Sequence, residues 1–210
     1  MSDPSVTDET RERIKAEAER CFLRYGIRAV SMDDLARELS ISKRTIYQHF
    51  KDKDELILET FLAHRDRDVA CLTRFRSQAT DAVEEMILIS THLRRMFQEM
   101  NPMVLYDLKK YHPRVWDTFD EHRETCLLMS LEANLRRGVS EGVYRDDVDP
   151  EILSRLRIEQ VQMAFDGRLF PTDRFAFAEV QMQFLTHFIH GLVTPRGREL
   201  VVAYQQKHNP

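Results

Sequence analysis

The stretch SMDDLARELSISKRTIYQHFKDKDELI, residues 31–57, holds two short amphipathic patterns separated by two residues. In the first pattern, Ser31 and Asp34 have the spacing of a capping box, with Asp in place of the usual Glu. The hydroxyl of Ser31 is expected to cap a helix that ends near Ser40. The first pattern therefore predicts a short helix that buries its apolar side chains along one face.

The second pattern predicts another helix over residues 43–50, with Ser42 as its N-cap. Ile46 and Phe50 are four residues apart and lie on its buried side. The segment KDKDELI, residues 51–57, then forms a turn and the start of a longer helix that extends into the 70s. Two short helices joined by so tight a connection are typical of a helix-turn-helix motif.

A longer helix is predicted in front of this motif, from Thr10 to Tyr25. Its apolar or small residues recur at three- and four-residue steps, namely Ile14, Ala18, Cys21, Phe22 and Tyr25. Gly26 is expected to end this helix. A longer helix followed by two short ones is the arrangement in which the third helix enters the major groove of DNA.

The exposed surface of the helix over residues 43–50 carries side chains that can hydrogen-bond DNA: Lys43, Arg44, Thr45, Tyr47, Gln48 and His49. Arg44 and Gln48 share a face, and they are the candidates for base recognition because Arg pairs bidentately with guanine and Gln with adenine. The candidates for phosphate contacts, which set register without reading sequence, are Lys43, Tyr47, Lys53 and Ser31. Thr45 and His49 could do either, and Ser42 completes the predicted set.

Over residues 14–57, IKAEAERCFLRYGIRAVSMDDLARELSISKRTIYQHFKDKDELI, the chain resembles the N-terminal domain of TetR-family transcriptional regulators. The markers of this resemblance are FLRYG, the helix start SMDDLA, the recognition helix SKRTIYQHF and the entry FKDKDEL to the next helix. Many family members carry glycine where this chain has Arg44, and another glycine in the turn where it has Ser40. The resemblance implies phosphate contacts for Tyr47 and Lys53, and it places Thr45 and Gln48 on the groove-facing helix.

An isolated basic and aromatic amphipathic helix is more often a solvated surface than a DNA reader. The match in order over the whole of residues 14–57 reverses that preference and favours DNA binding. A helical protein that kept this scaffold and lost the activity is the remaining alternative.

Beyond residue 80 the pattern predicts helix after helix, punctuated by prolines and glycines. The predicted segments are 82–99, 102–110, 113–142, 150–167, 174–192 and a last helix after Pro195. No repeat and no strand-like alternation long enough for a sheet is found. The sequence therefore predicts an all-α fold. Its first domain, residues 7–67, is a TetR-type helix-turn-helix DNA-binding domain with the motif at 31–50, and its second, residues 68–210, is a helical ligand-binding and dimerisation domain.

The resemblance implies a homodimer in which two long late helices of each protomer, here 150–167 and 174–192, form a four-helix bundle. The apolar bulk for such an interface comes from Phe165, Phe175, Phe177, Met182, Phe184, Leu185 and Phe188. The same residues could instead fill the core of the protomer. A dimer would place two recognition helices on successive major-groove faces of a near-palindromic site.

Candidate contacts to a small-molecule ligand lie between residues 96 and 116, namely Met96, Phe97, Met100, Met103, Tyr106, Tyr111 and Trp116. Methionines adapt to irregular apolar ligands, although methionine and aromatic stripes more often form ordinary core. His187 and His190 could ligate a metal from one helix face, but surface or hydrogen-bonded histidines explain a single HxxH pair better. We predict no metal and no cofactor.

Composition narrows the class of protein. The formal net charge of -4 argues against coating nucleic acid through bulk positive charge but leaves room for a local DNA-binding face. Cys21, Cys71 and Cys126 lack a CxxC spacing and fit a reducing cytoplasm. The start MSDPSVTDET is polar and acidic, and no apolar run reaches the length of a membrane span. We expect a cytoplasmic protein that does not bind membranes.

The functional prediction is a sequence-specific DNA-binding transcriptional regulator, a repressor whose operator affinity is modulated by a small molecule. One alternative is a helical scaffold that senses a ligand or metal without binding DNA. The other is an all-α enzyme, which we do not predict because no GxSxG, HExxH or glycine-rich phosphate loop is present. DNA binding that weakens steeply with salt would distinguish the regulator from the enzyme.

Overall fold

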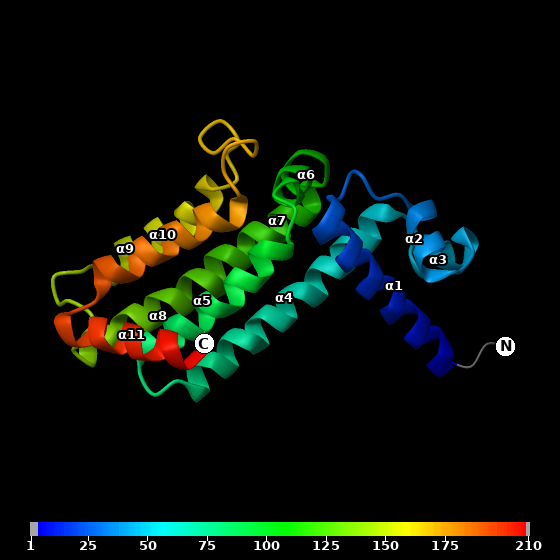
Figure 1. Ribbon diagram of the computed structural model, residues 1–210. Coiled ribbons are helices and arrows are strands. Elements are labelled where there is room, and N and C mark those ends of the chain that lie inside the picture. Colours follow the sequence, from blue (N-terminus) through cyan, green and yellow to red (C-terminus); the bar gives the residue numbers. More distant parts are fainter. Residues whose placement is uncertain (1–3, 209–210) are drawn as a thin grey trace. The chain divides into compact units, whose positions relative to one another are not determined.

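The computed structural model describes residues 4–208, which form helices and no strand (Figure 1). The helices are α1 Pro4–Tyr25, α2 Met32–Leu39, α3 Lys43–His49, α4 Lys53–Gln78, α5 Ala82–Glu99, α6 Met103–Tyr111, α7 Pro113–His122, the π-helical turn η1 Arg123–Leu127, α8 Leu128–Ser140, α9 Pro150–Met163, α10 Phe177–Leu192 and α11 Pro195–His208. The predicted all-α class is confirmed. None of the helices in the described residues is long and apolar enough to cross a membrane.

Most predicted helices agree with the structure to within a few residues. α1 begins at Pro4, six residues before the predicted start at Thr10, and the longest predicted helix also differs. The segment predicted as one helix over 113–142 is α7, the π-helical turn η1 and α8. The predicted helix over 150–167 ends earlier, at Met163, and α10 begins at Phe177 rather than at 174. The Asp166 carboxylate accepts a hydrogen bond from Arg168 N at 2.9 Å, and such local side-chain bonds favour a turn over a helix.

The chain divides into two compact units. Unit 1 comprises Met1–Arg67 and Glu99–Phe119, and unit 2 comprises Asp68–Gln98 and Asp120–Pro210. The segment 99–119 therefore packs with the helix-turn-helix region, although it lies within the predicted second domain. The predicted division into a DNA-binding domain, residues 7–67, and a ligand-binding and dimerisation domain, residues 68–210, stays a prediction.

The core of unit 1 is built from one face of each of its helices. Ile14, Leu35, Ile46 and Leu56 are all 0% exposed, and Val104, Leu108 and Val115 from the segment 99–119 join the same cluster. Burial of this apolar surface is the main stabilising contribution to the unit. It fixes α3 against α1, α2 and α4.

The loop between α1 and α2 has its backbone held by side chains from outside it. Gly26, at φ +89°, ends α1 in the left-handed region that glycine adopts most easily. Asp107 of α6 is buried and accepts a hydrogen bond from Arg28 N at 2.9 Å. Lys53, the first residue of α4, donates to the carbonyls of Ile27 and Val30 at 2.6 and 2.5 Å. Buried backbone polar groups need such partners, so these contacts fix the loop that leads into the motif.

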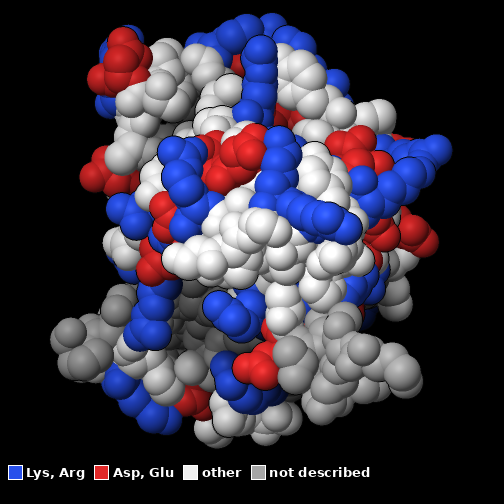
Figure 2. Space-filling view, turned by 90° about the vertical axis from the view of Figure 1, so that its right-hand side faces the viewer, with Lys and Arg blue, Asp and Glu red and all other residues white. Residues whose placement is uncertain are grey.

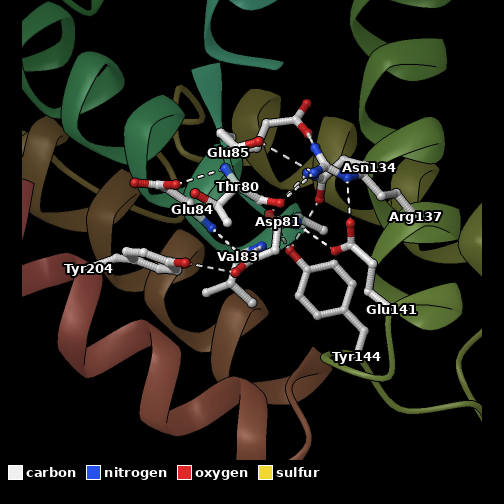
Figure 3. Close-up of polar contacts among 12 residues, drawn as sticks. Thr80, Asp81, Val83, Glu84, Glu85, Asn134, Arg137, Glu141, Tyr144 and Tyr204 are labelled. Carbon is white, nitrogen blue, oxygen red and sulfur yellow. Dashed lines mark hydrogen bonds and ion pairs between the residues drawn. The ribbon is translucent and has the colours of Figure 1, made fainter. Parts of the chain in front are cut away.

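Unit 2 has its own core around the first turns of α5 and the late helices. A polar cluster lies at the start of α5 (Figure 3). The Tyr144 hydroxyl, deep in the core, lies 3.0 Å from Ala82 O and 3.1 Å from Asn134 Oδ1. Glu141 accepts from Ala82 N at 2.8 Å and from Arg137 Nε at 2.6 Å. The cluster ties α8 and the turn that follows it to the N-terminus of α5.

Candidate nucleic-acid interface

The start of α2 has the capping geometry that its sequence predicts. Ser31 has an extended backbone, and its Oγ accepts from Asp34 N at 3.2 Å. The Asp34 carboxylate accepts from Ser31 N at 2.9 Å and from Ser31 Oγ at 2.6 Å, and these hydrogen bonds lower the pKa of Asp34. The capping box is confirmed, with Asp in place of Glu. The carboxylate also puts negative charge at the helix end where Ser31 was predicted to contact a phosphate.

The turn between α2 and α3 takes a glycine-like conformation without a glycine. Ser40 has φ 54° and ψ 40°, in the left-handed region. Its N–H donates to Arg37 O at 3.1 Å, and Ile41 N donates to Ala36 O at 3.0 Å. These bonds close the end of α2, so the departure from glycine at this position leaves the turn geometry intact.

Helix α3 buries one face and exposes the other. Ser42 caps it, with Oγ accepting from Thr45 N at 3.0 Å. Ile46 is 0% and Phe50 is 1% exposed, as their spacing predicted. Tyr47 is 46% exposed. Arg44 and Gln48 are also exposed, whereas Thr45 and His49 are half-buried.

The side chains of Arg44 and Gln48 make no hydrogen bond or ion pair with any other part of residues 4–208. With Tyr47 they occupy positions i, i+3 and i+4, which share one face of an α-helix. α3 has Lys43 and Arg44 in its first turn and no acidic residue. The face is therefore free to hydrogen-bond an external acceptor or donor.

The two lysines predicted to contact phosphate lie in different surroundings. Lys43 Nζ is 2.6 Å from Asp33 of α2 in an exposed ion pair, and this hydrogen bond raises the pKa of Lys43. Such surface pairs are weak, so a phosphate can displace the carboxylate. Lys53 is half-buried; burial lowers the pKa of its ammonium, which is bound to two loop carbonyls. A phosphate contact by Lys53 stays a prediction, and it would have to compete with these bonds.

Basic side chains are prominent on this side of unit 1. On the side that carries α1, α2 and α3 in Figure 1, Lys and Arg stand out in blue with Asp and Glu between them (Figure 2). A chain with a formal net charge of -4 can therefore still present cations locally to a polyanion.

Comparison with known proteins agrees with this geometry. Residues 14–60 match the model of the family described as bacterial regulatory proteins, tetR family. This segment is therefore a TetR-family N-terminal domain. The chain as a whole is 25% identical over 189 residues to the HTH-type transcriptional regulator YvaF of Bacillus subtilis (strain 168), covering 86% of the chain and 94% of that protein.

Solved structures share the fold of this chain. A TetR-family regulator from Agrobacterium tumefaciens matches with a TM-score of 0.74 and 15% identity, over 90% of this chain and 100% of that one. A transcriptional regulator from Saccharomonospora viridis, solved in complex with choline, matches with a TM-score of 0.70 and 22% identity, over 89% and 99%. At these identities the similarity shows the all-helical fold alone.

The predicted ligand contacts are divided between the two units. Met96 and Phe97 belong to unit 2, and the other five belong to unit 1. Phe97 is buried, with its ring centroid 5.5 Å from that of Phe177. Trp116 and Met100 pack on the core of unit 1, whereas three candidates are exposed: Met103, Tyr106 and Tyr111. Their role as ligand contacts stays a prediction.

The residues predicted to supply apolar bulk for a dimer interface differ in how deeply they are buried. Met182, Leu185 and Phe188 fill the core of unit 2, as the alternative interpretation expected. Phe175 is 39% exposed, and the half-buried ones are Phe165, Phe177 and Phe184. His187 and His190 are exposed, and no group of three or more metal-ligating side chains occurs among the described residues.

Two residues of interest, Asp33 and Arg157, were not singled out from the sequence. Asp33 pairs with Lys43 across the motif, and only the packing of α3 against α2 brings them together. Arg157 of α9 is 4% exposed. A signal for it was present, because Ser154, Arg157 and Ala164 follow the three- and seven-residue steps of one helix face, and all three are buried.

Proposed function

We propose that this chain binds operator DNA as a homodimer, with α3 in the major groove, and that a small molecule bound by unit 2 changes its affinity for DNA. The observation that carries the DNA-binding proposal is the free face of α3. Arg44 and Gln48 are exposed and have no partner within residues 4–208, while Ile46 and Phe50 anchor the opposite face. Side chains that are positioned and not yet engaged suit recognition of base edges.

Within this proposal the side chains of the motif divide by role. Arg44 and Gln48 read bases, while Lys43 and Tyr47 contact phosphates and set the register. Thr45 and Ser42, whose hydroxyl oxygens are 2.8 Å apart at the start of α3, and the half-buried His49 support these contacts.

Ser31 and Lys53 act chiefly inside the domain, because both are already engaged by protein groups. Ser31 starts α2, and Lys53 holds the loop in front of it. They therefore contribute to DNA binding by positioning the motif.

The dimer is proposed to form through α9 and α10. α9 has apolar side chains on a solvent-exposed stripe: Ile152 is 63%, Leu156 46% and Met163 43% exposed. Such a stripe on a helix of a water-exposed protomer marks an interaction surface. Two copies joined there would present two α3 helices to half-sites roughly 34 Å apart.

Regulation is proposed to follow from differential affinity. An effector releases the operator only if it binds the DNA-incompetent state more tightly than the competent one. The S. viridis neighbour binds choline, which supports a small-molecule effector for this fold. We infer repression as the outcome of operator binding and the cytoplasm, where the chromosome lies, as the place of action.

Binding of the purified protein to its own upstream DNA and to random DNA, across a salt series, tests the proposal. We expect preferential binding to the upstream DNA and a steep loss of affinity with salt. Arg44→Ala should cost about 1 to 3 kcal/mol on the operator and relax specificity. Arg136→Ala, which removes an exposed arginine of α8 paired with Glu132, is the matched control and should bind as the wild type does.

One outcome would contradict the role of Arg44, and another would call for a second experiment. Arg44→Ala and wild type binding the operator equally well would remove Arg44 from base recognition. If the wild type shows no preference for upstream DNA, selection from a random DNA library decides between an operator elsewhere and the scaffold that has lost DNA binding.

A further inference from the structure

Helix α9 places the side chain of one arginine in the interior of unit 2. Arg157 is 4% exposed, and Ser154 and Ala164 on the same face are 0% and 5% exposed. At about 100° per residue, Arg157 lies about 140° around the helix from Ile152. It therefore faces away from the exposed apolar stripe that we assign to the dimer.

The guanidinium of Arg157 has no internal partner at its end. Both terminal nitrogens are buried, and neither has a hydrogen-bond partner within residues 4–208. Burial lowers the pKa of Arg157 to about 10, which leaves it charged at neutral pH. A buried charge without a counter-ion is costly, and a water molecule could satisfy its N–H groups but could not neutralise it.

Two buried amide oxygens in unit 2 also lack a hydrogen-bond donor among the described residues, one on α9 and one on the neighbouring α10. Gln160 follows Arg157 by three residues, and its Oε1 is buried and unpartnered among the described residues. Gln181 of α10 is 0% exposed and donates from Nε2 to Val161 O at 2.9 Å, which fixes its amide against α9. Its Oε1 also has no donor within residues 4–208. The interior of unit 2 thus combines an unpaired cation with two free acceptors.

We propose that Arg157, with Gln160 and Gln181, binds the effector of this regulator, and that the effector is a small carboxylic acid with a neighbouring hydroxyl or amino donor. The carboxylate pairs bidentately with the planar guanidinium, and the donor bonds the glutamine oxygens. This inference rests on the proposed function, because it names the chemical class of its effector. Choline carries a fixed positive charge that Arg157 repels, so the effector differs from the ligand of the S. viridis neighbour.

Thermal unfolding with defined probes tests the site. The probes are sodium 3-hydroxybutyrate and sodium butyrate, with uncharged butyramide and choline chloride as controls, all in chloride buffer at constant ionic strength. We expect 3-hydroxybutyrate at about ten times its Kd to raise the Tm of the wild type by about 3 to 6 °C. Butyrate should bind roughly tenfold more weakly because it lacks the hydroxyl donor. Butyramide and choline should give no shift.

Variants of α9 assign the effect to one residue. Arg157→Met should lose the response to both carboxylates and keep or raise its Tm in chloride, because no internal partner is lost. Arg157→Lys keeps the positive charge but lacks the planar guanidinium that pairs bidentately with a carboxylate. It should therefore show a smaller rise in Tm with the carboxylates. Arg155→Met is the control; Arg155 is an exposed arginine on the same helix, near Glu151 and Glu124, and its variant should respond as the wild type does.

Three results would overturn the site: no carboxylate response in the wild type, an equal response in Arg157→Met, or a shift with choline or butyramide equal to that with butyrate. Operator binding separates this inference from the proposed function. Arg157→Met should bind operator as the wild type does without probe and should not respond to 3-hydroxybutyrate. A wild type that responds to the carboxylate but binds no DNA would defeat the proposed function and leave the carboxylate site standing.

Discussion

Single residues of the motif show how packing sets what a charged side chain can do. Lys43 and Lys53 are both near α3 and both were predicted to contact phosphate. Lys43 is exposed and holds only Asp33 in a surface ion pair. Lys53 is half-buried, with its ammonium on the carbonyls of Ile27 and Val30 and 5.7 Å from the centre of the Phe22 ring. The lysine side chain at position 43 is thus available to DNA, whereas the one at position 53 is bound by the protein itself.

Lys53→Met is expected to destabilise the protein by about 1 to 3 kcal/mol, because it leaves two carbonyls without their donor. Lys43→Met is the matched control and should change stability by less than about 1 kcal/mol, since an exposed pair contributes little. Urea unfolding of both variants at pH 7 measures the difference. If Lys53→Met unfolds as the wild type does but binds random DNA more weakly, Lys53 contacts phosphate and its bonds to the loop are dispensable.

At the scale of the element, α5 and α11 are joined through charged groups at their ends. Asp81 accepts from Val83 N and Glu84 N, both at 2.9 Å, and so caps the start of α5. Tyr204 of α11 donates to Asp81 at 2.7 Å (Figure 3). Buried Glu84 accepts from Lys207 Nζ at 2.8 Å and lies 3.0 Å from His208 Nε2. The last turn of α11 is therefore fixed to the first turn of α5.

These contacts predict a loss of stability in acid. Burial alone would raise the pKa of Glu84, but hydrogen bonds from Lys207, Thr80 and His208 lower it from 4.5 to about 2. Because the folded-state pKa lies below the unfolded-state value, the stabilisation is complete above about pH 4.5 and is lost as the pH falls towards 2. Glu84→Gln should cost about 1 to 3 kcal/mol at pH 7, and the difference from wild type should shrink at pH 3.

Urea unfolding at the two pH values checks this prediction, with Glu132→Gln as the control. Glu132 forms an i,i+4 pair with Arg136 on the surface of α8, so its variant should stay within about 0.5 kcal/mol of wild type at both values. A cost for Glu84→Gln that does not change between pH 7 and pH 3 would show that the charge of Glu84 is not what holds α11.

For the whole molecule, the proposed dimer makes DNA affinity depend on a surface outside the DNA-binding motif. Two half-sites bound by linked motifs gain affinity because the second contact is intramolecular. Leu156 lies in the middle of the exposed stripe of α9. A charge there would be buried without a partner in the dimer and is accommodated only in the monomer.

Leu156→Glu is therefore expected to give a monomer at micromolar concentration and to lose at least tenfold in operator affinity. Val202→Glu is the control, because Val202 of α11 is also about half exposed and lies outside the stripe. Sedimentation velocity reports the mass, and a DNA titration reports the affinity. A Leu156→Glu variant that remains dimeric, particularly beside a monomeric Val202→Glu, would place the interface elsewhere.

The sequence by itself determined the features that rest on interactions three or four residues apart. The capping box at Ser31, the N-cap at Ser42, the buried pair Ile46 and Phe50, and the end of α1 at Gly26 are all confirmed by the structure. The exposure of Arg44 and Gln48 was also predicted from helix periodicity alone. Helix periodicity and local hydrogen bonds depend only on the order of residues along the chain, so the all-α class and the motif could be predicted.

Only the tertiary structure decided the contacts between residues distant in sequence. Lys53 meets carbonyls 26 and 23 residues away, and Arg28 meets Asp107 at a separation of 79. The local pattern also could not decide that Phe188 fills the protomer core, or that the terminal nitrogens of Arg157 have no partner within residues 4–208. The physical reason is that burial depends on which elements pack together, and a helix face of a given composition can meet a core, a partner or a ligand.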